Sequence, residues 1–393
     1  MLVLKYDAAA GGAPDQYGDA ADRLIDRDGG LLQVFRKAQA GFMAPKAPLS
    51  AAVDAWLAKR GPRGEPVVVM VHGYQFDPGN VSGDGTDPDS PFGSVYGPPP
   101  AVDHHMSWLP LVGECDQTGG SPAENAIAFC YKSEAGMTEF AKAGWNNSYQ
   151  YAVFDQSTLA ARALAAILVS LSGKVATVRI LAHSLGTRTT SQAIRLAKGH
   201  LAPSLDRVLL LDGAEFSVDA LVSFADCTFD VFNITNRTDK VLKVGGDQMC
   251  HPFRLNGSAS AGTIGFDGLG GNDRWLDLQL DNPDLVKWFA AQQAPTGTSY
   301  SINGRALEKS HPNADLDHWS CYTNDGNRAL MRDLLFSEEM TVAGMKARGV
   351  PDGTDSPLYG GFNGFAVPPT PQSRAERRGM LERDNTMSGG GGS

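Results

Sequence analysis

The chain has 393 residues, of which 42% are hydrophobic and 20% charged, and its formal net charge is −10. This composition is typical of a globular protein with a sizeable core. The sequence contains neither a concentrated basic stripe nor a run of about 20 apolar residues. We therefore expect neither a nucleic-acid partner nor stable membrane insertion.

The cysteines and the first residues indicate the cellular compartment. The five cysteines are odd in number and have no CxxC spacing, and residues 1–7 lack a basic segment followed by a long apolar one. These features favour reduced thiols, no signal peptide and a cytoplasmic protein. A pair between Cys227 and Cys250 stays open.

The first 74 residues are predicted to contain two strands and three helices. Residues 2–6 fit an edge strand, and residues 20–27 and 31–40 have helical patterns. Ser50 is predicted to cap a third helix that ends at Gly61. Residues 66–71 are continuously apolar, as in a strand buried on both faces, and they lead into His72-Gly73-Tyr74.

Residues 75–125 are rich in Gly, Pro, Asp and Ser and are predicted to form a long loop insertion. The insertion could fold over a pocket as a lid, since it directly follows the His-Gly-Tyr turn. Its acidic residues suggest calcium, but their spacing does not match an EF-hand loop; they are Asp84, Asp87 and Asp89. His104-His105 has no partner at metal-ligand spacing and is assigned to the surface or a pocket rim, so no metal is expected.

The second half of the chain alternates between buried strands and amphipathic helices. Strands are predicted over 126–131, 176–182, 207–212, 230–235, 275–280 and 299–302, and helices over 154–171, 185–198, 218–225, 282–291 and 326–336. Such alternation predicts an α/β fold with a mostly parallel sheet and helices on both faces. We expect one domain over residues 1–336 and a peripheral tail over 337–393.

Ser184 lies where the strand over residues 176–182 meets the helix that follows. A serine at such a turn can sit on a strained backbone with its hydroxyl above the sheet edge, as in a nucleophile elbow. The positions two before and two after it must be small, and they are Ala182 and Gly186. The usual motif has glycine at both positions, so Ala182 is a departure. The helix N-terminus favours negative charge at this turn.

A serine needs a general base and an orienting carboxylate to act as a nucleophile. Asp239 follows the strand over residues 230–235, and His318 lies in a later loop. Asp212 is the rival acid because it also follows a buried strand, and His311 and His251 are rival bases. His72 and His183 are expected to be structural because the turns that they sit in fix their places.

The order Ser184, Asp239, His318 and the surrounding residues resemble the α/β-hydrolase superfamily, on its esterase and lipase side. The resemblance covers residues 67–336 and rests on the stretches at 69–74, 181–187, 236–242 and 317–319. It implies an α/β-hydrolase fold with an eight-stranded, mostly parallel sheet, a metal-free triad and no cofactor. The backbone N–H groups of Tyr74 and Leu185 would form the oxyanion hole.

The resemblance leads us to expect a serine hydrolase that cleaves a small-molecule carboxylic ester through an acyl-serine. An acyltransferase, thioesterase or amidase with the same triad is the enzymatic alternative. A non-catalytic binding protein on the same scaffold is the alternative from another class. The sequence predicts neither the substrate nor the oligomeric state.

Overall fold

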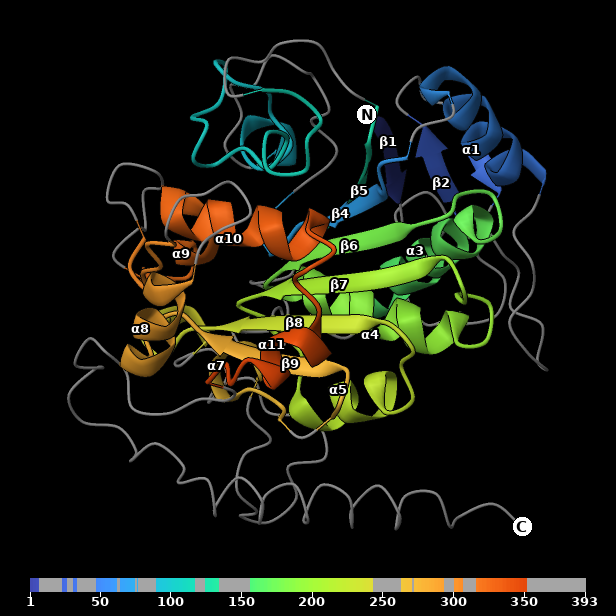
Figure 1. Ribbon diagram of the computed structural model, residues 1–393. Coiled ribbons are helices and arrows are strands. Elements are labelled where there is room, and N and C mark those ends of the chain that lie inside the picture. Colours follow the sequence, from blue (N-terminus) through green and yellow to red (C-terminus); the bar gives the residue numbers. More distant parts are fainter. Residues whose placement is uncertain are drawn as a thin grey trace, which may run out of the picture.

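The computed structural model describes residues 1–6, 23–26, 31–33, 47–61, 64–74, 76, 90–116, 124–133, 156–242, 263–270, 272–292, 300–306 and 316–351. These residues form a nine-stranded sheet in the order β3-β2-β1-β5-β4-β6-β7-β8-β9 (Figure 1). The strands are β1 (Leu2–Tyr6), β2 (Arg23–Asp26), β3 (Leu31–Gln33), β4 (Val67–Val71), β5 (Ala126–Tyr131), β6 (Val178–His183), β7 (Leu205–Leu211), β8 (Asp230–Thr235) and β9 (Trp275–Gln279).

Seven of these strands, from β1 through β5, β4, β6, β7 and β8 to β9, are parallel to one another, whereas β2 and β3 are antiparallel additions at one edge. The helices are α1 (Ala47–Arg60), α3 (Ser157–Leu171), α4 (Leu185–Ala197), α5 (Ser217–Phe224), α7 (Ile264–Asp267), α8 (Pro283–Ala291), α9 (Ser320–Thr323), α10 (Asp325–Phe336) and α11 (Val342–Ala347). The chain is thus an α/β protein, as the alternation of strand and helix patterns predicted.

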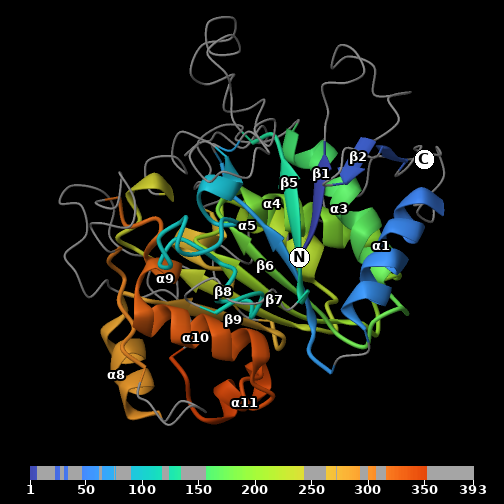
Figure 2. The ribbon, with the colours of Figure 1, turned by 90° about the horizontal axis from the view of Figure 1, so that it is seen from above.

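The central strands are apolar throughout because both faces of the sheet are covered. Val67, Val69 and Val71 of β4 pack into one core together with α1, α3 and α4. Val68 and Met70 point to the opposite face, where residues 95–112, α10 and α11 form a second core. Figure 2 shows α3 and α4 on one side of the sheet and α10 and α11 on the other.

The N-terminal segment differs from its predicted structure. Residues 23–26 and 31–33 form β2 and β3, where helices were predicted, and β1 lies inside the sheet rather than at its edge. Each of the two short strands buries a leucine, and Leu24 lies opposite Leu32 across the antiparallel pair. A buried leucine in each segment fits either periodicity, so the pairing of β2 with β1 and of β3 with β2 decided the structure.

Three other differences concern element ends. Ser50 lies inside α1 instead of capping it, whereas Gly61 ends the helix as predicted, with a φ of 73°. The strand predicted over 299–302 is absent at residues 300–302, where Tyr300 and Ile302 are buried in irregular backbone. A short apolar segment can be buried without joining a sheet.

The chain does not leave the core at residue 336, where the peripheral tail was expected to begin. Met340, Val342 and Met345 belong to the second core, and Val342 and Met345 lie on α11. Residues 352–393 lie outside the described residues. No helix in the described part of the chain has the length and apolar character needed to cross a bilayer.

Candidate active site

Ser184 occupies a strained turn between β6 and α4. Its φ is 53° and its ψ is −124°, a conformation that costs a side-chain-bearing residue about 1–3 kcal/mol. Three backbone hydrogen bonds hold this turn. Ser184 N–H donates to the Leu211 carbonyl at 2.9 Å, and the Ser184 carbonyl accepts from Thr187 N–H and Ala214 N–H, each at 3.0 Å. Strain that is maintained in this way is typical of functional sites.

The turn after β4 packs directly against this serine. A Cβ built on Gly186 would lie 2.4 Å from the carbonyl oxygens of Val71 and His72, so no side chain fits there. A Cβ on Gly73 would lie 2.8 Å from the Ser184 Cβ. The structure therefore brings the turn that holds Tyr74 against the N-terminus of α4, where Leu185 is the first helical residue.

His318 and Asp239 form a buried pair. His318 Nδ1 lies 2.6 Å from Asp239 Oδ2, and both side chains are almost completely buried. The other carboxylate oxygen of Asp239 accepts a hydrogen bond from the Leu242 N–H at 2.9 Å. With Nδ1 donating to the carboxylate, Nε2 retains its lone pair and can act as a proton acceptor.

His318 is held beside the serine turn by the residue that precedes Ser184. His183 Nε2 lies 3.0 Å from the backbone carbonyl of His318, and an N–H donated there fixes the loop that carries His318. The two imidazole rings are 4.7 Å apart between centroids. Ser184, His318 and Asp239, which the sequence placed in separate segments, are therefore gathered at the carboxyl edge of the sheet.

Asn236 is a structural link that the sequence analysis did not single out. Its side-chain Nδ2 donates to the carbonyls of Gly304 and Asp317, at 2.7 and 3.2 Å, and to the Ser320 hydroxyl at 3.0 Å. It thereby ties the turn that carries Asp239 to the segments on both sides of His318. An asparagine that opens a short polar turn after a buried strand was the available signal.

Asp212, the rival acid, lies near the pair but is not bonded to His318. It is fully buried, and neither side-chain oxygen has hydrogen-bond geometry with a partner in the described part of the chain. Burial and the negative charge of Asp239 raise the pKa of Asp212 well above its usual range. The surroundings of Asp212 thus favour its protonated form, and the geometry selects Asp239 as the partner of the imidazole.

The other histidine beside the site has a structural environment. His72 Nδ1 donates to the Gly73 carbonyl at 2.9 Å, and Nε2 accepts from the Tyr131 N–H at 3.2 Å. Burial lowers the pKa of His72 to about 4, so the ring is neutral. His251 and His311 lie outside the described residues.

The position of the site follows from the strand order. Strand β5 lies on one side of β4, and β6, the next strand along the chain, lies on the other side of β4. The direction in which successive strands join the sheet therefore reverses between β4 and β6. Ligands of open α/β sheets bind at the carboxyl ends of strands at such a point. Ser184 follows β6, and the turn over residues 72–74 follows β4.

The segment that was expected to be a lid is partly a core element. Within 90–116, the described part of that segment, eight large apolar side chains are buried: Val95, Tyr96, Val102, Met106, Trp108, Leu109, Leu111 and Val112. The Trp108 ring lies edge-on to those of His183 and Tyr322, with centroids 6.3 and 5.5 Å away. These residues therefore form a wall of the site. The three aspartates considered for calcium lie outside the described residues.

Among the described residues, the cysteines form no disulfide, and those beside the pair do not suit a metal site. Cys115, Cys130, Cys227 and Cys321 are free thiols, and Cys250 lies outside the described residues. The ligand atoms of His183, Asp212 and Cys321 lie within 4.8 Å of one another. Burial raises the pKa of the Cys321 thiol, and His183 Nε2 already binds a carbonyl. This trio does not suit a metal ion, since metal ligands must be deprotonated and free.

No protein-family profile matches the chain. A search of curated proteins also finds no match.

Proposed function

We propose that the chain is a serine hydrolase of the α/β-hydrolase fold that cleaves a carboxylic ester. The observation that carries the proposal is the strained Ser184 turn beside the buried pair of His318 and Asp239. The strand order supports it as well, because the serine follows β6, the acid follows β8, and the base comes after β9 at the same edge of the parallel sheet.

In this mechanism the Ser184 hydroxyl attacks the ester carbonyl while His318 Nε2 takes its proton. Asp239 holds the imidazole in the required tautomer and stabilises the imidazolium. The oxyanion of the tetrahedral intermediate accepts hydrogen bonds from the Leu185 and Tyr74 N–H groups. His318 then protonates the leaving alcohol, an acyl-serine remains, and water activated by His318 releases the acid.

Labelling with a fluorophosphonate tests the nucleophile directly. The probe phosphonylates a serine only where a base and an oxyanion hole activate it, and peptide mapping should place the adduct on Ser184. Ser184→Ala should abolish labelling and lower turnover of p-nitrophenyl esters by at least about a thousandfold. Ser50→Ala, which replaces a half-buried serine on α1, serves as the matched control and should keep both the labelling and the ester turnover of the wild type.

The same experiment separates the alternatives. A non-catalytic binding protein would give no adduct at all. An acyltransferase would be labelled at Ser184 but would transfer the acyl group to an added alcohol faster than to water. Replacing the ester by the matching thioester or amide distinguishes a thioesterase or an amidase. A Ser184→Ala protein with near wild-type ester turnover would reject the proposal.

A further inference from the structure

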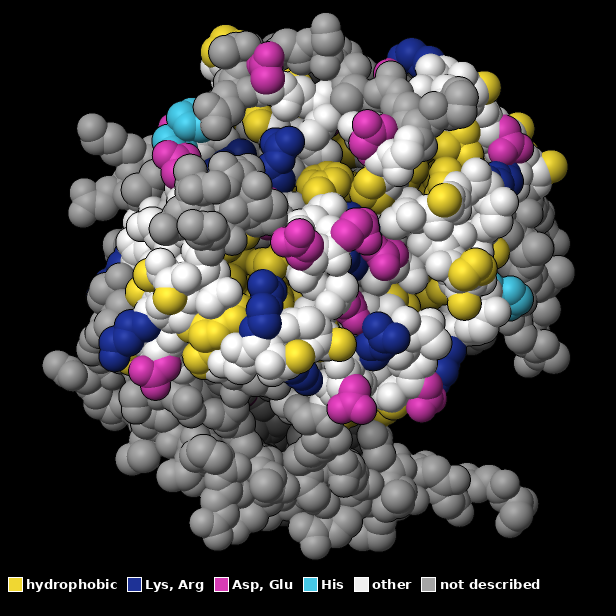
Figure 3. Space-filling model, viewed as in Figure 1, with side chains coloured by type: hydrophobic (Ala, Val, Ile, Leu, Met, Phe, Trp, Pro, Cys, Tyr) yellow, Lys and Arg dark blue, Asp and Glu magenta, His cyan; other side chains and the backbone are white. Residues whose placement is uncertain are grey.

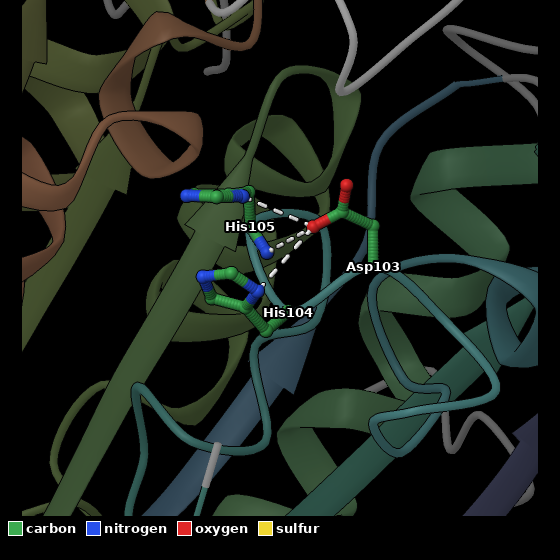
Figure 4. Close-up of side chains that lie close together, drawn as sticks. All are labelled: Asp103, His104 and His105. Atoms are coloured by element: carbon green, nitrogen blue, oxygen red, sulfur yellow. Dashed lines mark hydrogen bonds and ion pairs between the residues drawn. The ribbon is translucent and has the colours of Figure 1, made fainter. Parts of the chain in front are cut away.

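A group of metal-binding side chains lies away from the catalytic pair, on the segment over residues 90–116. Asp103, His104 and His105 each offer a ligand atom, and these atoms all lie within 4.8 Å of one another. Figure 4 shows both histidines beside the Asp103 carboxylate, with the dashed lines from each meeting at one of its oxygens. We propose that these three residues bind one divalent transition-metal ion, of which Zn²⁺ is the representative.

The distances within the group suit such an ion. Asp103 Oδ1 lies 3.0 Å from His105 Nδ1 and 3.6 Å from His104 Nδ1. Ligands about 2.0–2.1 Å from a tetrahedral Zn²⁺ are separated by about 3.3 Å from one another. Small side-chain rotations therefore bring all three donors to bonding distance. Imidazole and carboxylate donors favour Zn²⁺ or its neighbours Co²⁺ and Ni²⁺ over Mg²⁺ or Ca²⁺.

A fourth residue, on another element, supplies the outer contact that metal-bound histidines usually have. His105 Nε2 lies 3.4 Å from Asp325 Oδ1, at the start of α10, while His105 Nδ1 faces Asp103. A carboxylate on the far nitrogen holds the ring in the tautomer whose near nitrogen is free to bind a metal. His104-His105, which had no partner at metal-ligand spacing in the sequence, thus lies beside two carboxylates in the structure, those of Asp103 and Asp325.

The charges and the anchoring of the backbone also favour a bound cation. Asp103 and Asp325 contribute two negative charges, and the neighbouring Arg328 guanidinium contributes one positive charge. Arg328 donates to the backbone carbonyls of His105 and Ser107, at 3.0 and 2.9 Å, so the segment is fixed on α10 before any ion binds. A largely preformed site lowers the entropic cost of binding.

An ion bound here would link the 90–116 segment to the helix that follows the catalytic base. Arg328 also donates to the Tyr322 carbonyl at 2.9 Å, and Tyr322 lies four residues after His318. The ion would be structural, since its ligands lie on the outer side of this wall and are half-buried or exposed. Its presence should therefore appear in thermal stability as well as in binding.

The test is titration of EDTA-treated, full-length protein with Zn²⁺, followed by calorimetry, and with Co²⁺, followed by visible absorption. We expect one ion per chain and a melting temperature that rises by a few degrees with Zn²⁺, because the ion binds the folded state. His105→Ala and Asp103→Asn should each weaken Zn²⁺ binding by at least about tenfold, and Asp325→Asn by about 10- to 100-fold.

Two control variants make the result specific. His200→Ala removes an exposed histidine from the α4–β7 connection and should leave Zn²⁺ affinity unchanged. Ser184→Ala should bind Zn²⁺ like the wild type, so the site is tested independently of the hydrolase proposal. The variants of the four site residues should melt at the wild-type temperature in EDTA. Absence of saturable binding, or binding that persists in a His104→Ala/His105→Ala double variant, would overturn the proposal.

Discussion

Two buried carboxyl groups near the imidazole have opposite electrostatic environments. Asp239 is bonded to His318 Nδ1 and to the Leu242 backbone N–H. The neighbour of Asp212 is instead the weakly donating Cys321 thiol, and burial together with the charge of Asp239 opposes the ionisation of Asp212. Two neighbouring carboxyls in a low-dielectric site cannot both ionise easily, which favours the protonated form of Asp212. The sequence made both residues candidates because each follows a buried strand.

Substitution by asparagine should separate the two residues. In Asp239→Asn the amide leaves the imidazole in the wrong tautomer, and we expect ester turnover to fall about ten-thousandfold. In Asp212→Asn a neutral amide of the same shape replaces a carboxyl whose protonated form is favoured by burial, so turnover should change by less than about tenfold. The measurement is kcat/KM for a p-nitrophenyl ester at pH 7.5. A greater loss in Asp212→Asn would assign the acid to that residue instead.

The raised pKa of Asp212 also predicts how stability depends on pH. The unfolded chain releases this proton near pH 3.8, whereas the folded protein keeps it, so Asp212 lowers stability as pH rises from that value toward its folded pKa. Relative to the wild type, Asp212→Asn should gain up to about 1.4 kcal/mol of unfolding free energy per pH unit in that range. Urea unfolding at pH 5 and pH 8 measures the difference. A difference that does not change with pH would mean that Asp212 is ionised when folded.

At the scale of elements, the 90–116 segment combines loop-like composition with core packing. Its Gly, Pro and Asp residues predicted a lid, yet it has the single short helix η2 (Pro91–Gly93) and buries many apolar side chains. Apolar residues without a helical or strand period are easily mistaken for an exposed loop. The wall over the sheet edge is formed by irregular backbone, which Arg328 and the Tyr96 hydroxyl fix to neighbouring elements.

Truncation of Trp108 should show that this segment belongs to the core. Trp108 is fully buried, so Trp108→Ala should lower the free energy of unfolding by about 3–5 kcal/mol. Trp108→Phe should cost much less, because it keeps most of the ring and removes an indole N–H that has no partner in the described part of the chain. Ala101→Ser, at an exposed position of the same segment, is the control. A loss of ester selectivity without a loss of stability in Trp108→Ala would restore the lid interpretation.

At the scale of the whole molecule, the sequence predicted the central strands of the sheet correctly but not the two strands at its N-terminal edge, β2 and β3. The central strands were predictable because burial on both faces leaves long apolar runs, and β5 and β8 have the predicted bounds. Strands β2 and β3 were not predictable, because β2 depends on its pairing with β1 and β3 on its pairing with β2. The bond between His318 and Asp239 could be proposed from chain order, whereas its positioning by Asn236 depends on contacts between segments up to 84 residues apart.

The face shown in Figure 3 mixes basic and acidic side chains without a continuous basic area, in line with the net charge of −10. The two cores beneath the surface share every central strand. Adjacent residues of β6 illustrate this, since Ile180 belongs to the core on the α3 and α4 side and Leu181 to the core on the α10 side.

Because one sheet separates the two cores, we expect damage to either core to destabilise the whole molecule in a single transition. Ile180→Ala and Leu181→Ala should each lower the free energy of unfolding by about 2–5 kcal/mol. The slope of that free energy against urea concentration should stay that of the wild type.

Far-ultraviolet and near-ultraviolet circular dichroism should give the same unfolding midpoint in each variant, since the first reports the helices and strands and the second the packed aromatic rings. Tryptophans occur in both cores, with Trp275 in the first and Trp108 in the second. Separate midpoints in Leu181→Ala alone would show that the α10 side, with the wall of the site, unfolds independently of the sheet.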